Sequence, residues 1–204
     1  PLGSRGVSFI QGMCHLWYQP MDWRKRGNPN GFIPFDEFTG PFLRYGSNAP
    51  EQLQAIRLAG MILWSDIVQP LDQLRNWTLY ASNKRFAGMW SWDHAFGALA
   101  LARCHPLLAT ETMKSIYAAQ APNGQIPDML TDSTINWNYS KPPVQPMIFA
   151  EMCMRNGMAP DASLLENFGR HIDFYLDNLG ESDGLAMYLH GNDSGEDNST
   201  VFMD

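Results

Sequence analysis

The segment between Ser163 and Gly180 sets the strongest constraint on how this chain can fold. Ser163 and Glu166 have the spacing of a capping box at a helix start, and Gly180 stands where a C′ glycine would end the helix. Apolar side chains recur between these signals at helical spacing, namely Leu165, Phe168, Ile172, Tyr175, Leu176 and Leu179. The pattern predicts an amphipathic helix whose apolar stripe packs inside a helical body.

Helical signals recur through most of the chain. Apolar residues follow one helix face from Leu53 to Ile67, with Pro50 in the first turn and Pro70 at the end. Further helices are expected at about 94–103, 110–120 and 144–155, the first of them with Asp93 as its N-cap. No stretch alternates with the period of a β-strand. The sequence therefore predicts an all-α body with long, polar, glycine-containing loops.

Composition limits the classes of partner. The chain has 204 residues, of which 45% are hydrophobic and 12% aromatic, so one domain or a piece of a larger one can bury a core. Its net charge of −7 and the absence of a long basic run argue against a nucleic-acid partner. No apolar stretch approaches the roughly 20 residues of a membrane span, which predicts a soluble protein of unknown compartment. Three scattered cysteines predict free thiols.

The chain divides into three parts by its sequence pattern. Residues 1–4 resemble the remnant of a cleaved expression tag and are excluded. Residues 5–48 are rich in aromatic and turn-forming residues without a regular period, which predicts an irregular arm. This arm would clamp over the body, form a wall of a ligand cleft, or do both. Residues 49–204 make up the predicted helical body.

Polar loops precede the predicted helices, and several carry groups suited to carbohydrate chemistry. In a ring of helical hairpins, loops at the same end of alternate helices converge on one mouth. That arrangement would gather the side chains of Trp92, Asp93, Gln125, Trp137, Asn138, Lys141 and Asp197 round one pocket. Two simpler interpretations stay open, with Asp93 as a plain N-cap and residues 191–200 as a solvated surface loop.

Four motifs occur in order between Trp90 and Thr200: W-x-W-D-x-x-F, N-G-Q-I-P-D, N-W-N-x-S-K-P-P and D-S-G-x-D-N-S. The succession resembles glycoside hydrolase family 63, which includes processing α-glucosidase I, and more distantly the family 37 trehalases. The resemblance implies an (α/α)6 barrel that cleaves α-glucosidic bonds with inversion. It implies Asp197 as the general acid, and Asp93 with Trp92 as the residues that hold the sugar in the −1 subsite. The motifs add Trp90, Gln125, Trp137, Asn138, Lys141 and Gly195 as substrate-binding residues.

The predicted chemistry needs two carboxyl groups on opposite faces of the sugar. One must stay protonated, which requires burial or a neighbouring charge such as that of Asp193 or Glu196. Glu196 departs from the family's bulky apolar residue at that position. The family's general base lies far downstream, and about five helices are predicted where the barrel has six hairpins. We therefore expect this chain to hold only the N-terminal part of the barrel, completed by a downstream or partner segment.

Other interpretations remain. The missing base favours a non-catalytic carbohydrate-binding helical module or an inactive fragment, and a trehalase-like disaccharidase is a narrower enzymatic alternative. The expected partner is an α-linked oligosaccharide or glucoside, and its hydrolysis needs no cofactor. Calcium is an option at Asp177, Glu181 and Asp183, where a solvated turn is the simpler interpretation. The five histidines show no metal-ligand spacing.

Overall fold

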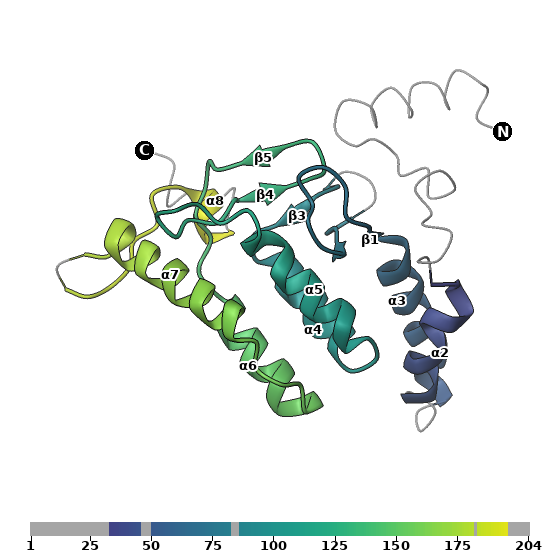
Figure 1. Cartoon of the computed structure of the whole chain (residues 1–204). Coiled ribbons are helices and arrows are strands. Elements are labelled where there is room, and N and C mark those ends of the chain that lie inside the picture. Colours follow the sequence, from purple (N-terminus) through teal and green to yellow (C-terminus); the bar gives the residue numbers. More distant parts are fainter. Residues whose placement is uncertain (1–32, 46–49, 83–85, 182, 196–204) are drawn as a thin grey trace, which may run out of the picture.

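The computed structural model describes residues 33–45, 50–82, 86–181 and 183–195. These residues are mostly helical, as predicted from the sequence. The helices are α2 (Phe35–Tyr45), α3 (Leu53–Ser65), α4 (Asp93–Ala102), α5 (Pro106–Tyr117), α6 (Gln145–Asn156), α7 (Ala162–Leu179) and the short α8 (Gly191–Ser194), with a 3-10 turn at Pro50–Gln52. Figure 1 shows α2 beside α3, α4 beside α5 and α6 beside α7.

Two small antiparallel sheets lie near one end of the helices, and the sequence did not predict them. One joins β1 (Ile67–Val68) to β2 (Thr78–Leu79); the other has the order β3 (Met89–Trp90), β4 (Met129–Leu130) and β5 (Ile135–Asn136). Each strand is two residues long, which is too short for alternation to be visible in the sequence. β3 directly precedes α4, so the second sheet fixes the loop that enters this helix.

The core is built round α4, which packs against both α5 and α6. Small residues make this possible, because Ala95, Ala98 and Ala102 are all buried and let the neighbouring backbones approach closely. Met113 and Ile116 of α5 fill the space beside them. The first residue of α4 is Asp93, so a well-packed central helix holds this carboxylate in place.

Helix α7 presents a different face from the one predicted. Its buried residues are Leu164, Phe168, His171, Phe174, Tyr175 and Leu179. Leu165 and Leu176 are each 52% exposed and Ile172 is 36% exposed, so half of the predicted core stripe faces outward. The alternative stripe includes His171, whose Nδ1 lies 3.2 Å from the Tyr117 hydroxyl. Apolarity alone could not indicate that a histidine belongs inside.

The ends of α7 also differ from the predicted capping. Its N-cap is Asp161, whose carboxylate accepts the Leu164 N–H at 3.1 Å, whereas Ser163 lies inside the helix. Gly180 has an extended backbone instead of the left-handed C′ conformation. It is nevertheless constrained, because a Cβ at this position would stand 2.2 Å from the Leu176 carbonyl oxygen.

Three other helix predictions need correction. α4 begins at Asp93 itself, its N-cap is Trp92, and no side chain caps it. α5 begins at Pro106 instead of Thr110, since proline suits the first turn of a helix as well as ending the one before. α2 lies within the segment predicted as an irregular arm, with Pro41 inside the helix. In the described part of the chain, no helix has the length and apolarity required to cross a membrane.

Candidate active site

A cleft of about 520 Å³ opens beside the start of α4, and we call it the Asp93 cleft. Its walls come from the loop before β3, from the β3–α4 junction, from the β4 and β5 region, from the segment before α6, and from α8. The lining residues are Ala81, Phe86, Trp90, Trp92, Asp93, Asp128, Asn136, Tyr139, Lys141, Asn192 and Gly195. Parts of all four sequence motifs therefore meet in one cavity.

The sheet β3–β4–β5 holds three of these motifs in register. Trp90 pairs with Met129, and Met129 pairs with Asn136. The Ser91 N–H donates to the Asp128 carbonyl at 2.8 Å, which extends the contact to the residue before Trp92. Two-residue strands thus set the relative positions of side chains that lie far apart in the sequence.

The Asp93 carboxyl group stands in the cleft and remains accessible to water. Partial desolvation by the cleft walls raises the pKa of Asp93 from its ordinary value. Its own backbone N–H and the charge of Lys141 act in the opposite direction and lower that pKa. The aromatic rings of Trp90 and Trp92 line the same cavity and are half-buried. The arrangement combines a hydrogen-bond acceptor with flat apolar faces.

Lys141 and Asp128 form a buried pair on the cleft wall. The Lys141 Nζ lies 3.7 Å from the Asp128 Oδ1, and the two side chains are 8% and 1% exposed. The same Nζ donates to the Asn192 carbonyl and lies 5.9 Å from the ring centroid of Trp92. An ammonium group this well buried is stable only with such partners. One cation therefore contacts residues of the first two motifs and the residue directly before the fourth.

The short helix α8 closes one side of the cleft. The Asp193 side chain accepts the N–H groups of Ser140 and His190, both at 2.9 Å. His190 in turn accepts the Asn192 N–H at 3.0 Å through its Nδ1, completing a reciprocal cap. The His190 ring stacks on Tyr139 with the ring centroids 4.9 Å apart.

Gly195 ends this turn in direct contact with the opposite wall. Its φ of 79° lies in the left-handed region, and a Cβ here would stand 2.4 Å from the Trp92 indole. Only glycine fits between the turn and the ring without moving one of them. The turn is therefore seated on Trp92.

Five of the predicted site residues line the Asp93 cleft, namely Trp90, Trp92, Asp93, Lys141 and Gly195. Gln125, Trp137 and Asn138 do not line it, although Gln125 donates from Nε2 to the Trp137 carbonyl at 3.3 Å. Trp137 is 37% exposed beside the cleft residue Asn136. Asp197 and its neighbour Glu196 lie outside the described residues.

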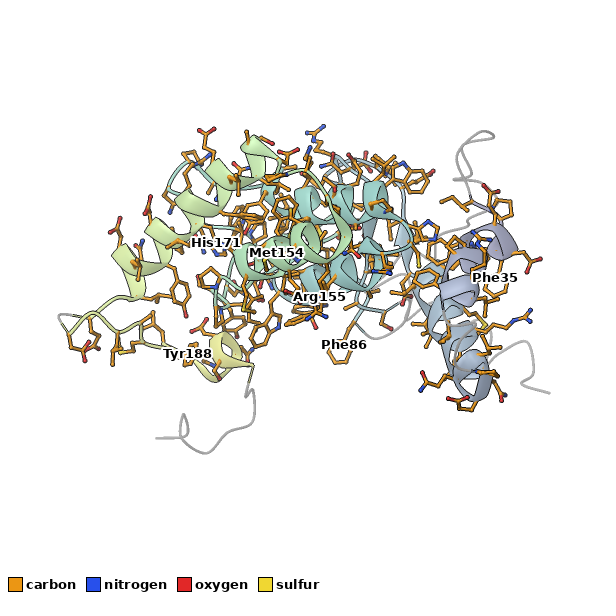
Figure 2. The ribbon with its side chains drawn as sticks, turned by 90° about the horizontal axis from the view of Figure 1, so that it is seen from below. Phe35, Phe86, Met154, Arg155, His171 and Tyr188 are labelled. Atoms are coloured by element: carbon orange, nitrogen blue, oxygen red, sulfur yellow. The ribbon has the colours of Figure 1, made fainter. Side chains whose placement is uncertain are left out.

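Several lining residues were not predicted. Asp128, Asn136, Tyr139 and Asn192 belong to the motifs or adjoin them, but the site residues predicted from the motifs are their neighbours. The motifs thus indicated which segments form the Asp93 cleft. Nothing in the sequence indicated which side chain of each segment faces it. Phe86 precedes the motifs and is 63% exposed. Figure 2 shows it pointing away from the body of the domain.

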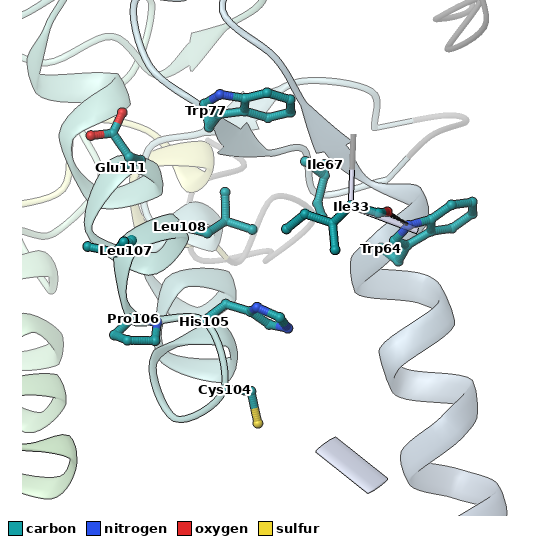
Figure 3. A pocket seen from close by; sticks show the side chains of 10 residues that line it. All are labelled: Ile33, Trp64, Ile67, Trp77, Cys104, His105, Pro106, Leu107, Leu108 and Glu111. Atoms are coloured by element: carbon teal, nitrogen blue, oxygen red, sulfur yellow. Dashed lines mark hydrogen bonds between the residues drawn. The ribbon is translucent and has the colours of Figure 1, made fainter. Parts of the chain in front are cut away.

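A second cleft of about 490 Å³ lies between α3 and the α4–α5 hairpin, and we call it the Trp64 cleft (Figure 3). Its walls are mostly apolar, with Ile33, Trp64, Ile67, Trp77, Leu107 and Leu108 among its residues. Glu111 is its only described carboxylate. The Trp64 Nε1–H donates to the Ile33 carbonyl at 2.9 Å, which is the dashed line in Figure 3.

The described residues contain no group of three or more histidine, cysteine, aspartate or glutamate side chains arranged to hold a metal. The Asp183 carboxylate accepts the Leu185 N–H at 3.0 Å, as in an ordinary turn. Calcium at Asp177, Glu181 and Asp183 stays an untested prediction.

Comparison with known proteins identifies one family. A family model described as the mannosylglycerate hydrolase MGH1-like glycoside hydrolase domain matches residues 87–204, which is more than half of the chain. None of the curated proteins matches the chain. The matched segment contains every lining residue of the Asp93 cleft except Ala81 and Phe86. The glycoside hydrolase prediction is confirmed at this level, whereas the narrower resemblances to families 63 and 37 stay predictions.

Proposed function

The chain belongs to the mannosylglycerate hydrolase MGH1-like glycoside hydrolase domain family, and we propose that it cleaves α-glucosidic bonds with inversion in the Asp93 cleft. The observation that carries the proposal is the meeting of all four motifs in that cavity. Hydrolysis of this kind uses two carboxyl groups and a sugar-binding surface, and needs no cofactor. The substrate would be an α-linked oligosaccharide or a simple glucoside.

We further propose that the described helices are part of an (α/α)6 barrel. Three features support this architecture. The longer helices run as side-by-side pairs, the Asp93 cleft lies beside the start of α4, and α7 exposes Leu165, Ile172 and Leu176 along its outer side. An apolar stripe of this kind is what a neighbouring helix in a ring would cover.

In the proposed mechanism Asp93 binds hydroxyl groups of the sugar in the −1 subsite. An ionised carboxylate accepts two hydrogen bonds at once, which suits adjacent hydroxyls. The half-buried rings of Trp92 and Trp90 would contact the apolar face of the same sugar. We keep Gln125, Trp137 and Asn138 as proposed contacts for groups beyond the cleft, since they adjoin its lining.

The proposed general acid is Asp197, two residues after Gly195 in the sequence. The contact of Gly195 with Trp92 supports this assignment, because it puts the end of the described turn, two residues earlier in the sequence, at the Asp93 cleft. Both oxygens of Asp193 are occupied by backbone N–H groups. The general base would come from a downstream or partner segment, on the opposite face of the sugar.

A change of leaving group tests the acid directly. Asp197→Asn in the catalytically complete protein should lower kcat on an α-linked oligosaccharide by about 10³-fold, the usual contribution of general acid catalysis. Glucosyl fluoride should retain turnover within about tenfold, because fluoride leaves without being protonated. Equal losses on the two substrates, or no loss on either, would remove Asp197 from the role of acid.

The family description favours mannosylglycerate as a second candidate substrate. Its glycerate group is anionic and would need a cationic partner. Among the described lining residues the cation is Lys141, which already contacts Asp128 and Asn192. We therefore favour an uncharged glucoside, and a higher kcat/KM on mannosylglycerate would reverse this order. Trehalose in the same panel tests the disaccharidase alternative, and binding without turnover would favour the binding module.

A further inference from the structure

We propose that Lys141 and Asp193 are positioning residues that clamp the α8 turn, Gly191–Gly195, against the wall of the Asp93 cleft. This inference rests on the proposed function, because the turn leads directly to Asp197. Neither side chain needs to touch the substrate for this role. The clamp would instead set the position from which the acid reaches the glycosidic oxygen.

The first half of the clamp is the Lys141 ammonium group. It is held in place by Asp128, with 3.7 Å between Nζ and Oδ1, and by two aromatic rings at 5.9 Å and 5.7 Å from their centroids, those of Trp92 and Tyr139. Its remaining contact is the hydrogen bond to the Asn192 carbonyl. The cation therefore ties the backbone of the turn to fixed groups on the opposite wall.

The second half of the clamp is the Asp193 carboxylate, which extends from the α8 turn to the backbone of the segment before α6. From inside the turn, its Oδ1 accepts the Ser140 N–H and its Oδ2 accepts the His190 N–H, both at 2.9 Å. Hydrogen bonds to an ionised acceptor are roughly twice as strong as neutral ones. The residue is only 4% exposed, so water competes little for these donors. Two adjacent residues, Ser140 and Lys141, thus hold the turn through independent contacts.

The last residue of the turn, Gly195, lies against the Trp92 ring of the cleft wall. Gly195 lies so close to Trp92 that a Cβ would overlap the indole ring. The clamp at Asn192 and Asp193 and the contact at Gly195 fix both ends of the same short segment. A shift of about 1 Å at a catalytic group can lower a rate by about 10²-fold.

A purely stabilising role is the competing explanation, and Asp161 provides a matched control. Like Asp193, Asp161 accepts a backbone N–H at the start of a helix, and in addition it pairs with Lys114 at 2.6 Å. It is the N-cap of α7 and does not line the Asp93 cleft. A substitution there removes similar interactions without changing the turn.

The kinetic test uses the catalytically complete protein, with assays well below the unfolding midpoint of each variant. Asp193→Ala should lower kcat on an α-linked oligosaccharide by about 10²-fold with KM within about threefold, and Asp193→Asn should lie between it and wild type. Asp161→Ala should lower the unfolding midpoint and leave kcat unchanged. Equal kcat values for Asp193→Ala and Asp161→Ala would overturn the positioning role.

Lys141 is tested as a pair, because removing it alone leaves the buried Asp128 without its cation. Asp128→Asn combined with Lys141→Met removes both charges and should recover the unfolding midpoint lost by Lys141→Met alone. The kcat of the double variant should stay at least about tenfold below wild type, since the Asn192 contact is still missing. Recovery of kcat together with stability would show that Lys141 serves the fold only, and would overturn its part in the clamp.

Amide hydrogen exchange separates failure of the clamp from failure of the proposed function. In this chain, Asp193→Ala should speed exchange at the Ser140 and His190 amides by about tenfold or more, whereas Asp161→Ala should leave them unchanged. If the wild-type protein hydrolyses no glycoside, the proposed function fails while this measurement still tests the clamp. Unchanged exchange in Asp193→Ala would overturn the clamp itself.

Discussion

The Asp93 cleft and the Trp64 cleft are nearly equal in size, at about 520 and 490 Å³, yet their walls differ in origin and chemistry. The first is lined largely by turns and strand ends and holds two carboxyl groups, a lysine and two asparagines. The second is lined largely by helix side chains and the chain just before them, with Glu111 as its described carboxylate. Cavity volume therefore does not distinguish the proposed active site from the Trp64 cleft, whereas the polar lining groups do.

The difference follows from how the backbone is satisfied in each place. The small sheet β3–β4–β5 pairs the main-chain groups of the loops, so their side chains are free to face the cavity. In α5 the helix satisfies its own backbone, and Leu107 and Leu108 present apolar surface to the Trp64 cleft. The short strands and loops at one end of the described helices thus carry most of the polar groups that line the Asp93 cleft.

The largest expected difference between the clefts is in turnover. Asp93→Asn removes a charged acceptor from the proposed −1 subsite and should lower kcat/KM on an α-glucoside by about 10²–10³-fold. Glu111→Gln makes the same chemical change in the Trp64 cleft and should leave kcat/KM within about twofold. Steady-state kinetics gives kcat/KM for the two variants, and circular dichroism checks that each keeps the wild-type fold.

The opposite ranking of the kcat/KM losses in these two variants would contradict the assignment of turnover to the Asp93 cleft. A large loss in Glu111→Gln with normal turnover in Asp93→Asn would move the site to the Trp64 cleft. Equal small losses would leave neither carboxylate in the mechanism.

Two glycines with left-handed backbone sharpen the comparison further. Gly195→Ala should lower kcat/KM by about 10²-fold, because the new Cβ would displace Trp92 or the turn. Gly157→Ala carries similar backbone strain, at φ 63° against 79°, but its Cβ meets nothing within 4 Å. It should lower stability by about 1 kcal/mol and leave kcat/KM unchanged. Similar kinetics for the two variants would exclude the Gly195–Trp92 contact from function.

The histidine-containing core between α5 and α7 limits the pH range in which the clefts can be compared. Burial lowers the pKa of His171 to about 4, and the neighbouring charge of His94 acts in the same direction. The unfolded chain takes up this proton at higher pH than the folded one. Stability from a neutral His171 is therefore complete above about pH 6.5 and is lost as the pH falls toward 4.

Thermal unfolding measures this effect. Between pH 7 and 4.5 the wild-type protein should lose about 2 kcal/mol more stability than His171→Gln, which does not titrate there. Parallel pH dependences for the two proteins would show that His171 is not held neutral in the folded state.

The helices were more predictable than the faces they present. α3 to α7 were expected because their apolar periodicity or their flanking prolines are visible in the sequence. The predicted start of α5, at residue 110, was four residues too late. Half of the inward face of α7 was predicted correctly, and half was missed since Leu165 and Ile172 are more apolar than His171, which is buried in contact with Tyr117. The two-residue strands depend on pairing between distant segments and leave no local pattern.

The cleft was predictable to the level of motifs. Trp92 and Asp93 were expected in it, and both line it. Asp128 was missed although its motif was noted, because its role depends on Lys141 lying opposite. That Asp193 acts on the pKa of Asp197 stays a prediction; what the sequence did not indicate is that the Asp193 oxygens accept the Ser140 and His190 backbone N–H groups. Such partnerships are set by tertiary structure, which spacing along the chain does not encode.

The most direct measurement is proton NMR of the first sugar that the catalytically complete protein releases from an α-glucoside. An inverting site predicts that the β-anomer of glucose appears first, before mutarotation brings in the α-anomer. The Asp93→Asn variant should show neither signal on the same timescale. An α-anomer released first, or release that is unaffected by Asp93→Asn, would contradict inverting hydrolysis in the Asp93 cleft.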